Sequence, residues 1–174
     1  MSSICYYITA TLAKSVERSH LQPLLAEHQM AFVPVECSTA ILKVRGNDRC
    51  YRPIQRHCDC DTTLGIIWRR GGSVSKRKIK RLRRHSSLSE EAMAEFVAAQ
   101  KHQLEKAPET VQWYNFIHAI LGTREVWHLG LILQWWDPKP AVIKRHEVVK
   151  KVDVTPEFLL SIEEEVFYDI QKER

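Results

Sequence analysis

The segment from Ile4 to Leu12, with the sequence ICYYITATL, sets the tightest limit on the fold of this chain. Aromatic and β-branched residues dominate it, which is typical of a β-strand. Tyr7 would lie on one face of the strand and Tyr6 and Ile8 on the other, so both faces carry apolar side chains. The segment therefore suits the centre of a sheet better than its edge.

The region after this strand predicts one helix and several short strands. We expect the helix within residues 15–29, beginning nearer Ser19 than Ser15, because Pro23 is tolerated only near the start of a regular helix. A strand that contains Pro34 or Pro53 is expected at the edge of a sheet, at a bulge or as irregular extended chain. The expected short strands within residues 31–68 are AFVPVE, TAILKVR, CYRPI and LGIIW.

The second half of the chain predicts three more helices. Ser87 and Glu90 have the spacing of a capping box at the start of one helix. Pro108 and Gly122 are placed to begin and end the next. Pro156 opens a last helix with an apolar face and an acidic outer face. The elements expected here are helices over 88–106 and 108–121, strands within 125–136 and 141–154, and a helix over 157–173.

Helix and strand patterns alternate irregularly along the chain. This order predicts an α+β fold, with an antiparallel or mixed sheet and about four helices packed mainly on one face. The length of 174 residues suits a single domain, and 44% hydrophobic and 27% charged residues are ordinary for a globular protein. With only 6 glycines and 7 prolines, collagen-like and disordered classes are excluded.

The sequence carries no recognisable secretion signal or membrane-spanning segment. The most apolar window covers residues 127–136, whereas about 20 apolar residues are needed to cross a bilayer. We therefore expect a cytoplasmic protein without a membrane partner. An odd number of cysteines without a signal predicts five reduced thiols rather than a disulfide framework. The cysteines are Cys5, Cys37, Cys50, Cys58 and Cys60.

The net charge of +5 is concentrated in one segment. Residues 62–89 contain no acidic side chain, and without the nine basic residues of this segment the chain would carry −4. We expect residues 69–86 to be exposed. They could contact nucleic-acid phosphates, or they could be a solvated or protein-binding surface, since His85 is the only aromatic residue between Ser73 and Leu88. The basic patch comprises Arg69, Arg70, Lys76, Arg77, Lys78, Lys80, Arg81, Arg83 and Arg84.

Residues 57–65, HCDCDTTLG, hold the one local cluster of reactive side chains. Imidazole and thiolate are the ligands that zinc prefers, and a closed structural site needs four of them. The C-x-C spacing is less typical of zinc sites than C-x2-C. The candidate ligands of zinc or another thiophilic metal are His57, Cys58, Cys60 and Cys50, with Cys37 as a further possibility.

Two other interpretations of this cluster remain open. His57 could lower the pKa of Cys58 and make it reactive. Alternatively the segment is a structural turn in which Asp59 and Asp61 bond nearby backbone amides and Gly65 permits a close backbone approach. His128 and the tryptophans at 113, 127, 135 and 136 are expected in the core rather than in a site.

Two stretches together suggest kinship with other proteins. They are Cys5-Tyr6-Tyr7-Ile8-Thr9-Ala10, followed by a helix, and His57-Cys58-Asp59-Cys60-Asp61-Thr62-Thr63-Leu64-Gly65. The chain resembles a group of small bacterial proteins that share a C-Y-Y-[IV]-T-A strand and an H-C-D-C-x-T-x-L-G loop. The resemblance covers about the first 65 residues and implies no particular activity.

The absence of a recognisable catalytic set favours a non-enzymatic binding protein. The first hypothesis is an immunity protein or antitoxin, whose acidic helix over 157–173 covers the cationic active site of a toxin. The alternative is a nucleic-acid-binding domain that uses the basic patch, with a zinc-stiffened loop. A metal or thiol enzyme centred on the His57–Cys60 segment is the third. The candidate partner-binding residues are Glu163, Glu164, Glu165 and Asp169.

Overall fold

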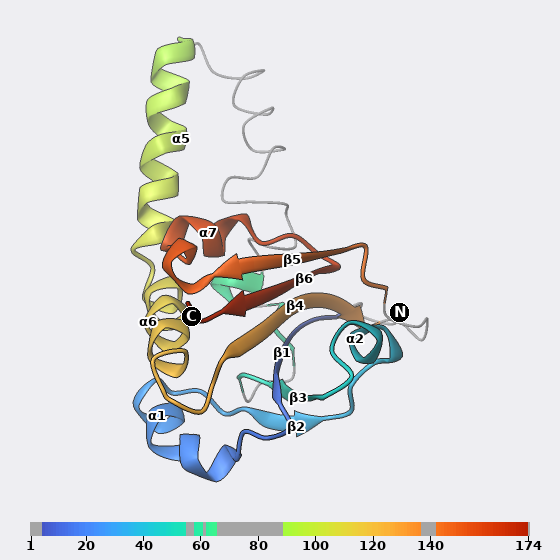
Figure 1. Cartoon of the computed structure of the whole chain (residues 1–174). Coiled ribbons are helices and arrows are strands. Elements are labelled where there is room, and N and C mark those ends of the chain that lie inside the picture. The colour runs from blue at the N-terminus through green and yellow to red at the C-terminus, as the bar shows by residue number, and fades with distance from the viewer. Residues whose placement is uncertain (1–4, 55–57, 61, 66–88, 137–141, 174) are drawn as a thin grey trace.

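A mixed six-stranded sheet organises the fold in the computed structural model, which describes residues 5–54, 58–60, 62–65, 89–136 and 142–173 (Figure 1). The strand order is β2-β3-β1-β4-β6-β5, and only β5 and β6 run parallel. β1 pairs with both β3 and β4, which confirms the central position expected for it. The strands are β1 (Cys5–Ala13), β2 (Val33–Val35), β3 (Asp48–Arg52), β4 (His128–Trp136), β5 (Arg145–Lys150) and β6 (Val166–Gln171).

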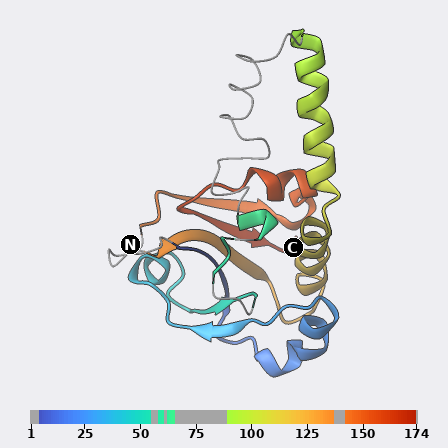
Figure 2. The ribbon, with the colours of Figure 1, turned by 180° about the vertical axis from the view of Figure 1, so that it is seen from behind.

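Helices pack on both faces of the sheet, but mainly on one. The main core joins α1, α6 and α7 to alternate residues of β1, including Tyr6 and Ile8. α5 extends away from the sheet, as Figures 1 and 2 show, and Met93 is its one fully buried residue. The helices are η1 (Arg18–Leu21), α1 (Gln22–Glu27), α2 (Thr39–Val44), α5 (Glu90–Glu105), α6 (Pro108–Ile120), η2 (Lys151–Asp153) and α7 (Pro156–Ser161).

The predicted α+β class is confirmed, and the sheet is mixed, which is one of the two types expected. The described residues form more helices than the four or so expected. Several local predictions hold. The regular helix α1 begins at Gln22, beside Pro23, after a short 3-10 turn. β2 contains Pro34 and lies at the edge of the sheet. Pro108 begins α6. The helix predicted over 88–106 is α5, but its cap is Ser89, whose hydroxyl accepts a hydrogen bond from the amide of Ala92, rather than Ser87.

The strand predicted for TAILKVR is wrong, because these residues form α2. Ser38 caps the helix by accepting a hydrogen bond from the amide of Ile41. Ile41 packs on Ile132 and Phe167 in a small second core on the opposite face of the sheet. A disulfide between Cys37 and Cys50 joins the start of α2 to β3, so the prediction of five reduced thiols is also wrong.

The acidic helix predicted over 157–173 is wrong as well. α7 ends at Ser161, and β6 follows from Val166 to Gln171. Glu165 between them has a φ of 61°, which interrupts any helix, and its amide donates to Leu133 of β4. The apolar residues that suggested a helix face are therefore divided between a short helix and a buried strand.

Some predictions fall on residues that the structure does not describe. They include the basic patch, His57, Asp61 and residues 66–68 of LGIIW, whereas Leu64 and Gly65 of that piece lie in a short helical turn. Among the described residues no helix is long and apolar enough to cross a membrane.

Candidate functional site

Polar residues cover the sheet face beside the small core under α2. The strand register places Thr11 opposite Gly130 and Gly130 opposite Asp169, so these positions of β1, β4 and β6 share one face. Two buried carboxylates lie on this face, each within a set of hydrogen-bonded side chains. A buried charge needs such partners to be stable, and the cluster of them marks this face as a candidate functional site.

The first carboxylate is Asp48, whose side chain is only 3% exposed. Its Oδ2 accepts a hydrogen bond from the Thr11 hydroxyl at 2.6 Å and lies 2.9 Å from Nε2 of His128. Burial acts to raise the pKa of Asp48, but the hydrogen bonds from His128 and Thr11 outweigh it and lower that pKa below its usual value. His128 is thus a satisfied, largely buried histidine, as the sequence predicts.

Gly130 allows these groups to approach so closely. A Cβ at this position would lie 2.3 Å from Thr11 Oγ1 and 2.5 Å from Cζ of Phe167. Both neighbours are fully buried, so neither can move aside without disturbing the core. The glycine therefore leaves the space that the Thr11 hydroxyl needs to reach Asp48.

The second carboxylate is Asp169 on β6, which is fully buried rather than exposed on a helix. It pairs with Arg45, at the end of α2, and accepts a hydrogen bond from Gln171 Nε2 at 2.7 Å. Nε2 of His146 lies 3.8 Å away, and burial together with the charge of Arg45 lowers the pKa of that histidine. A surface partner cannot contact Asp169 directly.

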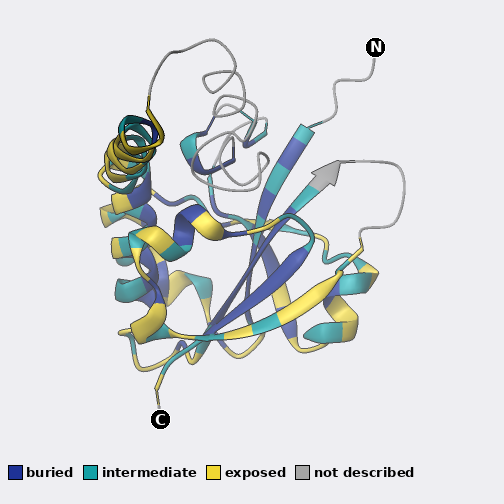
Figure 3. Ribbon diagram, turned by 90° about the horizontal axis from the view of Figure 1, so that it is seen from above, coloured by how far each residue is buried: buried dark blue, intermediate teal, exposed yellow. Residues whose placement is uncertain are grey.

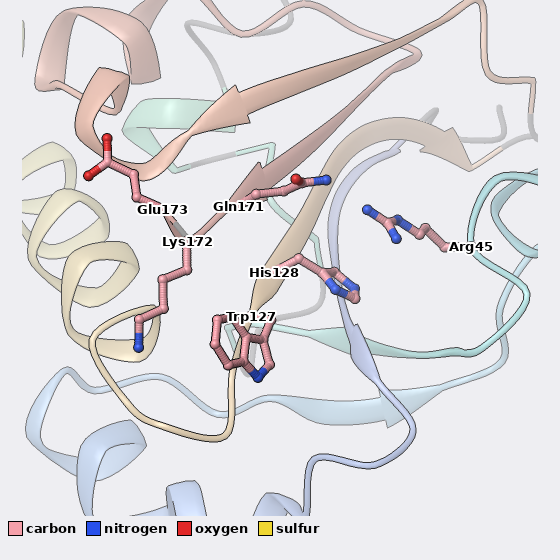
Figure 4. Close-up of a pocket in the computed structure, with 6 residues that line it drawn as sticks. All are labelled: Arg45, Trp127, His128, Gln171, Lys172 and Glu173. Atoms are coloured by element: carbon pink, nitrogen blue, oxygen red, sulfur yellow. The ribbon is translucent and has the colours of Figure 1, made fainter.

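A pocket of about 630 Å³ opens beside these pairs (Figure 4). Trp127 at its rim is 59% exposed, so the prediction that this residue lies in the core is wrong. β4 begins only at His128, and Trp127 therefore precedes the buried part of the strand. The ammonium of Lys172 lies 5.4 Å from the centroid of the Trp127 ring. The lining residues are Arg45, Trp127, His128, Gln171, Lys172 and Glu173.

The chemistry of the six lining residues suits binding. An exposed indole offers a stacking surface, and Arg45, Gln171 and Lys172 offer hydrogen-bond donors. None of the six is a serine, threonine or cysteine that could serve as a nucleophile. Nothing in the sequence pattern marked this pocket, because its residues come from three separate segments.

The predicted metal ligands are brought together only in part. Cys58 and Cys60 lie near Cys5 of β1, with the three Sγ atoms all within 4.8 Å of one another. Cys50 is wrong as a ligand because it is disulfide-bonded to Cys37. Cys5 was not among the predicted ligands, because it is remote along the chain from Cys58 and Cys60.

Hydrogen bonds attach the loop of residues 58–60 to β1. The Asp59 amide donates to the Tyr6 carbonyl at 2.9 Å, and the Ile8 amide donates to the Asp59 carboxylate at 2.8 Å. The Asp59 carboxylate therefore bonds a distant strand rather than nearby amides as predicted, while its carbonyl accepts a hydrogen bond from the Thr62 amide at 3.2 Å in a local turn. Gly65 does permit a close approach, since a Cβ there would lie 1.9 Å from the Asp59 carbonyl oxygen.

The environment of Cys60 does not favour a reactive thiolate. Burial raises the pKa of this thiol, the Tyr6 amide partly opposes that effect, and the neighbouring Cys58 adds to it. Reactive cysteines need a lowered pKa.

The three predicted partner-binding glutamates lie in the turn between α7 and β6. Glu163 is exposed and pairs with Arg145 at 3.2 Å, and Glu165 pairs with Lys144. Glu164 is partly buried, and this burial, with the nearby charge of Glu165, raises its pKa. Since neighbouring cations compensate two of them, the glutamates do not form the acidic surface predicted from the sequence.

No protein-family model, curated protein or solved structure matches the chain. The kinship suggested by the two N-terminal motifs therefore stays a prediction.

Proposed function

We propose that the chain is a non-enzymatic binding protein for single-stranded nucleic acid. The pocket takes one unpaired base, which stacks on Trp127, and the basic patch contacts the phosphate backbone. The observation that carries the proposal is the exposed indole of Trp127 beside Lys172 at the rim of the pocket. It supplies the stacking aromatic that the basic patch lacks.

The size and lining of the pocket support this assignment. Ligand pockets commonly enclose about 300–1,000 Å³, and the pocket at Trp127 falls within that range. Aromatic side chains beside cationic groups are the usual platform for unpaired bases. Lys172 is held in place by donating to the Thr123 carbonyl at 3.1 Å, so the cation is positioned beside the ring.

The charges assign different roles to the pocket and the basic patch. Asp169 compensates Arg45 in the pocket wall, and Glu173 adds a carboxylate to the lining. The pocket therefore supplies stacking and hydrogen bonds more than net attraction. Electrostatic attraction comes from the nine basic residues of the patch, each able to displace a counterion from the nucleic acid.

Titration with labelled single-stranded RNA and DNA at about 50 mM salt tests the proposal. Bound bases should quench part of the tryptophan fluorescence. Trp127→Ala should weaken binding by about 1–3 kcal/mol, whereas Trp127→Phe keeps most of the stacking. Val33→Ala, an exposed change on the far edge strand β2, is the control and should bind like the wild type. Absence of binding by the wild type, or equal affinity of Trp127→Ala, would reject the function.

The edge strand β5 favours protein binding as a second candidate. Val148 on this strand is 61% exposed, and Figure 3 shows the strand lying exposed along one side of the sheet. An open edge can pair with a strand of a partner. Toxin neutralisation by an immunity protein belongs to this candidate, now with β5 as the contact in place of an acidic helix.

Co-purification from the native host tests this second candidate. A partner protein bound through β5 should be retained by the wild type and lost with Val148→Lys, because the new charge would be desolvated at the interface. Val33→Lys places the same charge on β2, at the opposite edge, and should retain the partner. Equal retention by the two variants contradicts docking on β5.

A further inference from the structure

Three cysteines from two distant segments meet at the start of β1. We propose that Cys5, Cys58 and Cys60 together bind one zinc ion, which fastens the loop of residues 58–60 to the central strand. The site is separate from the pocket at Trp127 and does not depend on nucleic-acid binding. It differs from the ligand set predicted from the sequence, because Cys5 takes the place of Cys50 and His57 lies outside the described residues.

The separation of the sulfur atoms suits a tetrahedral ion. Zinc–sulfur bonds of about 2.3 Å place the sulfurs of a tetrahedral site about 3.8 Å apart. The three Sγ atoms all lie within 4.8 Å of one another, so small side-chain rotations are enough to close the site. All three cysteines are free of disulfides. The remaining position of the tetrahedron is open to water or an added ligand.

The surrounding backbone already holds two of the ligands in place. The Tyr6 amide donates a hydrogen bond to Sγ of Cys60 at 3.2 Å, an interaction that stabilises a metal-bound thiolate and orients it. Asp59, between the two loop cysteines, is bonded to β1 through its amide and its carboxylate. The loop therefore needs little reorganisation to bind an ion.

A further contact fixes the chain that follows the loop. The Thr62 hydroxyl donates to the Asp59 carbonyl at 2.9 Å, and the Thr63 amide donates to Glu109 of α6. The backbone of β1 and the Glu109 side chain of α6 thus hold the segment that carries Cys58 and Cys60. Such preorganisation reduces the conformational entropy that metal binding must overcome.

Metal analysis of the reduced, full-length protein tests the site. After loading with zinc sulfate and removal of free metal, the wild type should retain about one ion per chain. Each of Cys5→Ser, Cys58→Ser and Cys60→Ser should lose it. The Cys37→Ser/Cys50→Ser double variant is the matched control, because it removes two cysteines outside the site and should retain the zinc.

A second measurement on the wild type keeps the test decisive if the serine variants fail to fold. Cobalt(II) in place of zinc should give a thiolate-to-metal charge-transfer absorption, and X-ray absorption of the zinc form should show sulfur neighbours at about 2.3 Å. Circular dichroism reports folding of each variant. Reduced wild type without bound zinc and without the cobalt absorption overturns the proposal. Zinc retention by a folded Cys5→Ser variant also overturns it.

Discussion

Asp48 connects the strands of the polar sheet face through a single carboxylate. Thr11 of β1 and His128 of β4 both contact its Oδ2, so Asp48→Asn removes a charged acceptor from a buried network. We expect this change to lower the free energy of unfolding by about 1–3 kcal/mol at pH 7, since hydrogen bonds to buried charged groups contribute this much. Urea denaturation measures the effect.

The pH dependence of this effect follows from the lowered pKa of Asp48. A carboxyl whose pKa is lower in the folded state stabilises the protein above its unfolded pKa, and this contribution is lost as the pH falls through the folded pKa. The difference in unfolding free energy between wild type and Asp48→Asn should therefore hold from about pH 7 down to about pH 4 and shrink only below that, as the pH falls through the lowered pKa of Asp48. Asp153→Asn, at an exposed position, is the control. A difference in unfolding free energy that stays constant through the acidic range contradicts the role assigned to Asp48.

Single residues could be predicted where their effect is local. Pro34 marks an edge strand, Pro108 begins a helix and Gly65 permits a close approach, and each follows from backbone geometry alone. The contacts of Asp48 and Cys5 depend on which segments the sheet brings together. No spacing in a single sequence contains that information.

The element α2 shows how a helix can be mistaken for a strand. Its residues TAILKV include β-branched types that favour strands. The cap at Ser38 was the available signal, because serine there accepts a hydrogen bond from the third helical residue. Packing of Ile41 on the sheet then outweighs the weak strand propensity of a six-residue segment.

The elements α7 and β6 show the opposite error. Residues 166–170 are all buried, because the strand is covered on both faces of the sheet. A strand buried on both faces does not alternate between apolar and polar residues, and it is easily joined to a preceding helical pattern. Reading the two elements as one helix led to the predicted acidic helix and to the exposed position predicted for Asp169.

At the scale of the whole molecule, charge is distributed unequally along the chain. The nine basic residues of the patch account for more than the entire net charge of +5. Around the turn after α7, Lys144 and Arg145 compensate Glu165 and Glu163. The acidic C-terminal region is thus partly neutralised within the fold, and the sequence places the excess of positive charge in the basic patch.

This distribution of charge predicts that the contributions of charge and of base stacking to the proposed binding affinity can be separated by varying the salt concentration. For single-stranded nucleic acid, the logarithm of the binding constant falls with the logarithm of salt concentration by about 0.7 for each phosphate neutralised. Replacing the nine basic residues of the patch with glutamine should flatten this slope. Trp127→Ala should reduce affinity at every salt concentration and leave the slope unchanged, because stacking releases no counterions. Fluorescence anisotropy between about 50 and 200 mM salt measures both. If the glutamine variant keeps the wild-type slope, the phosphate contacts lie outside the basic patch. If Trp127→Ala flattens the slope, the pocket binds phosphate rather than a base.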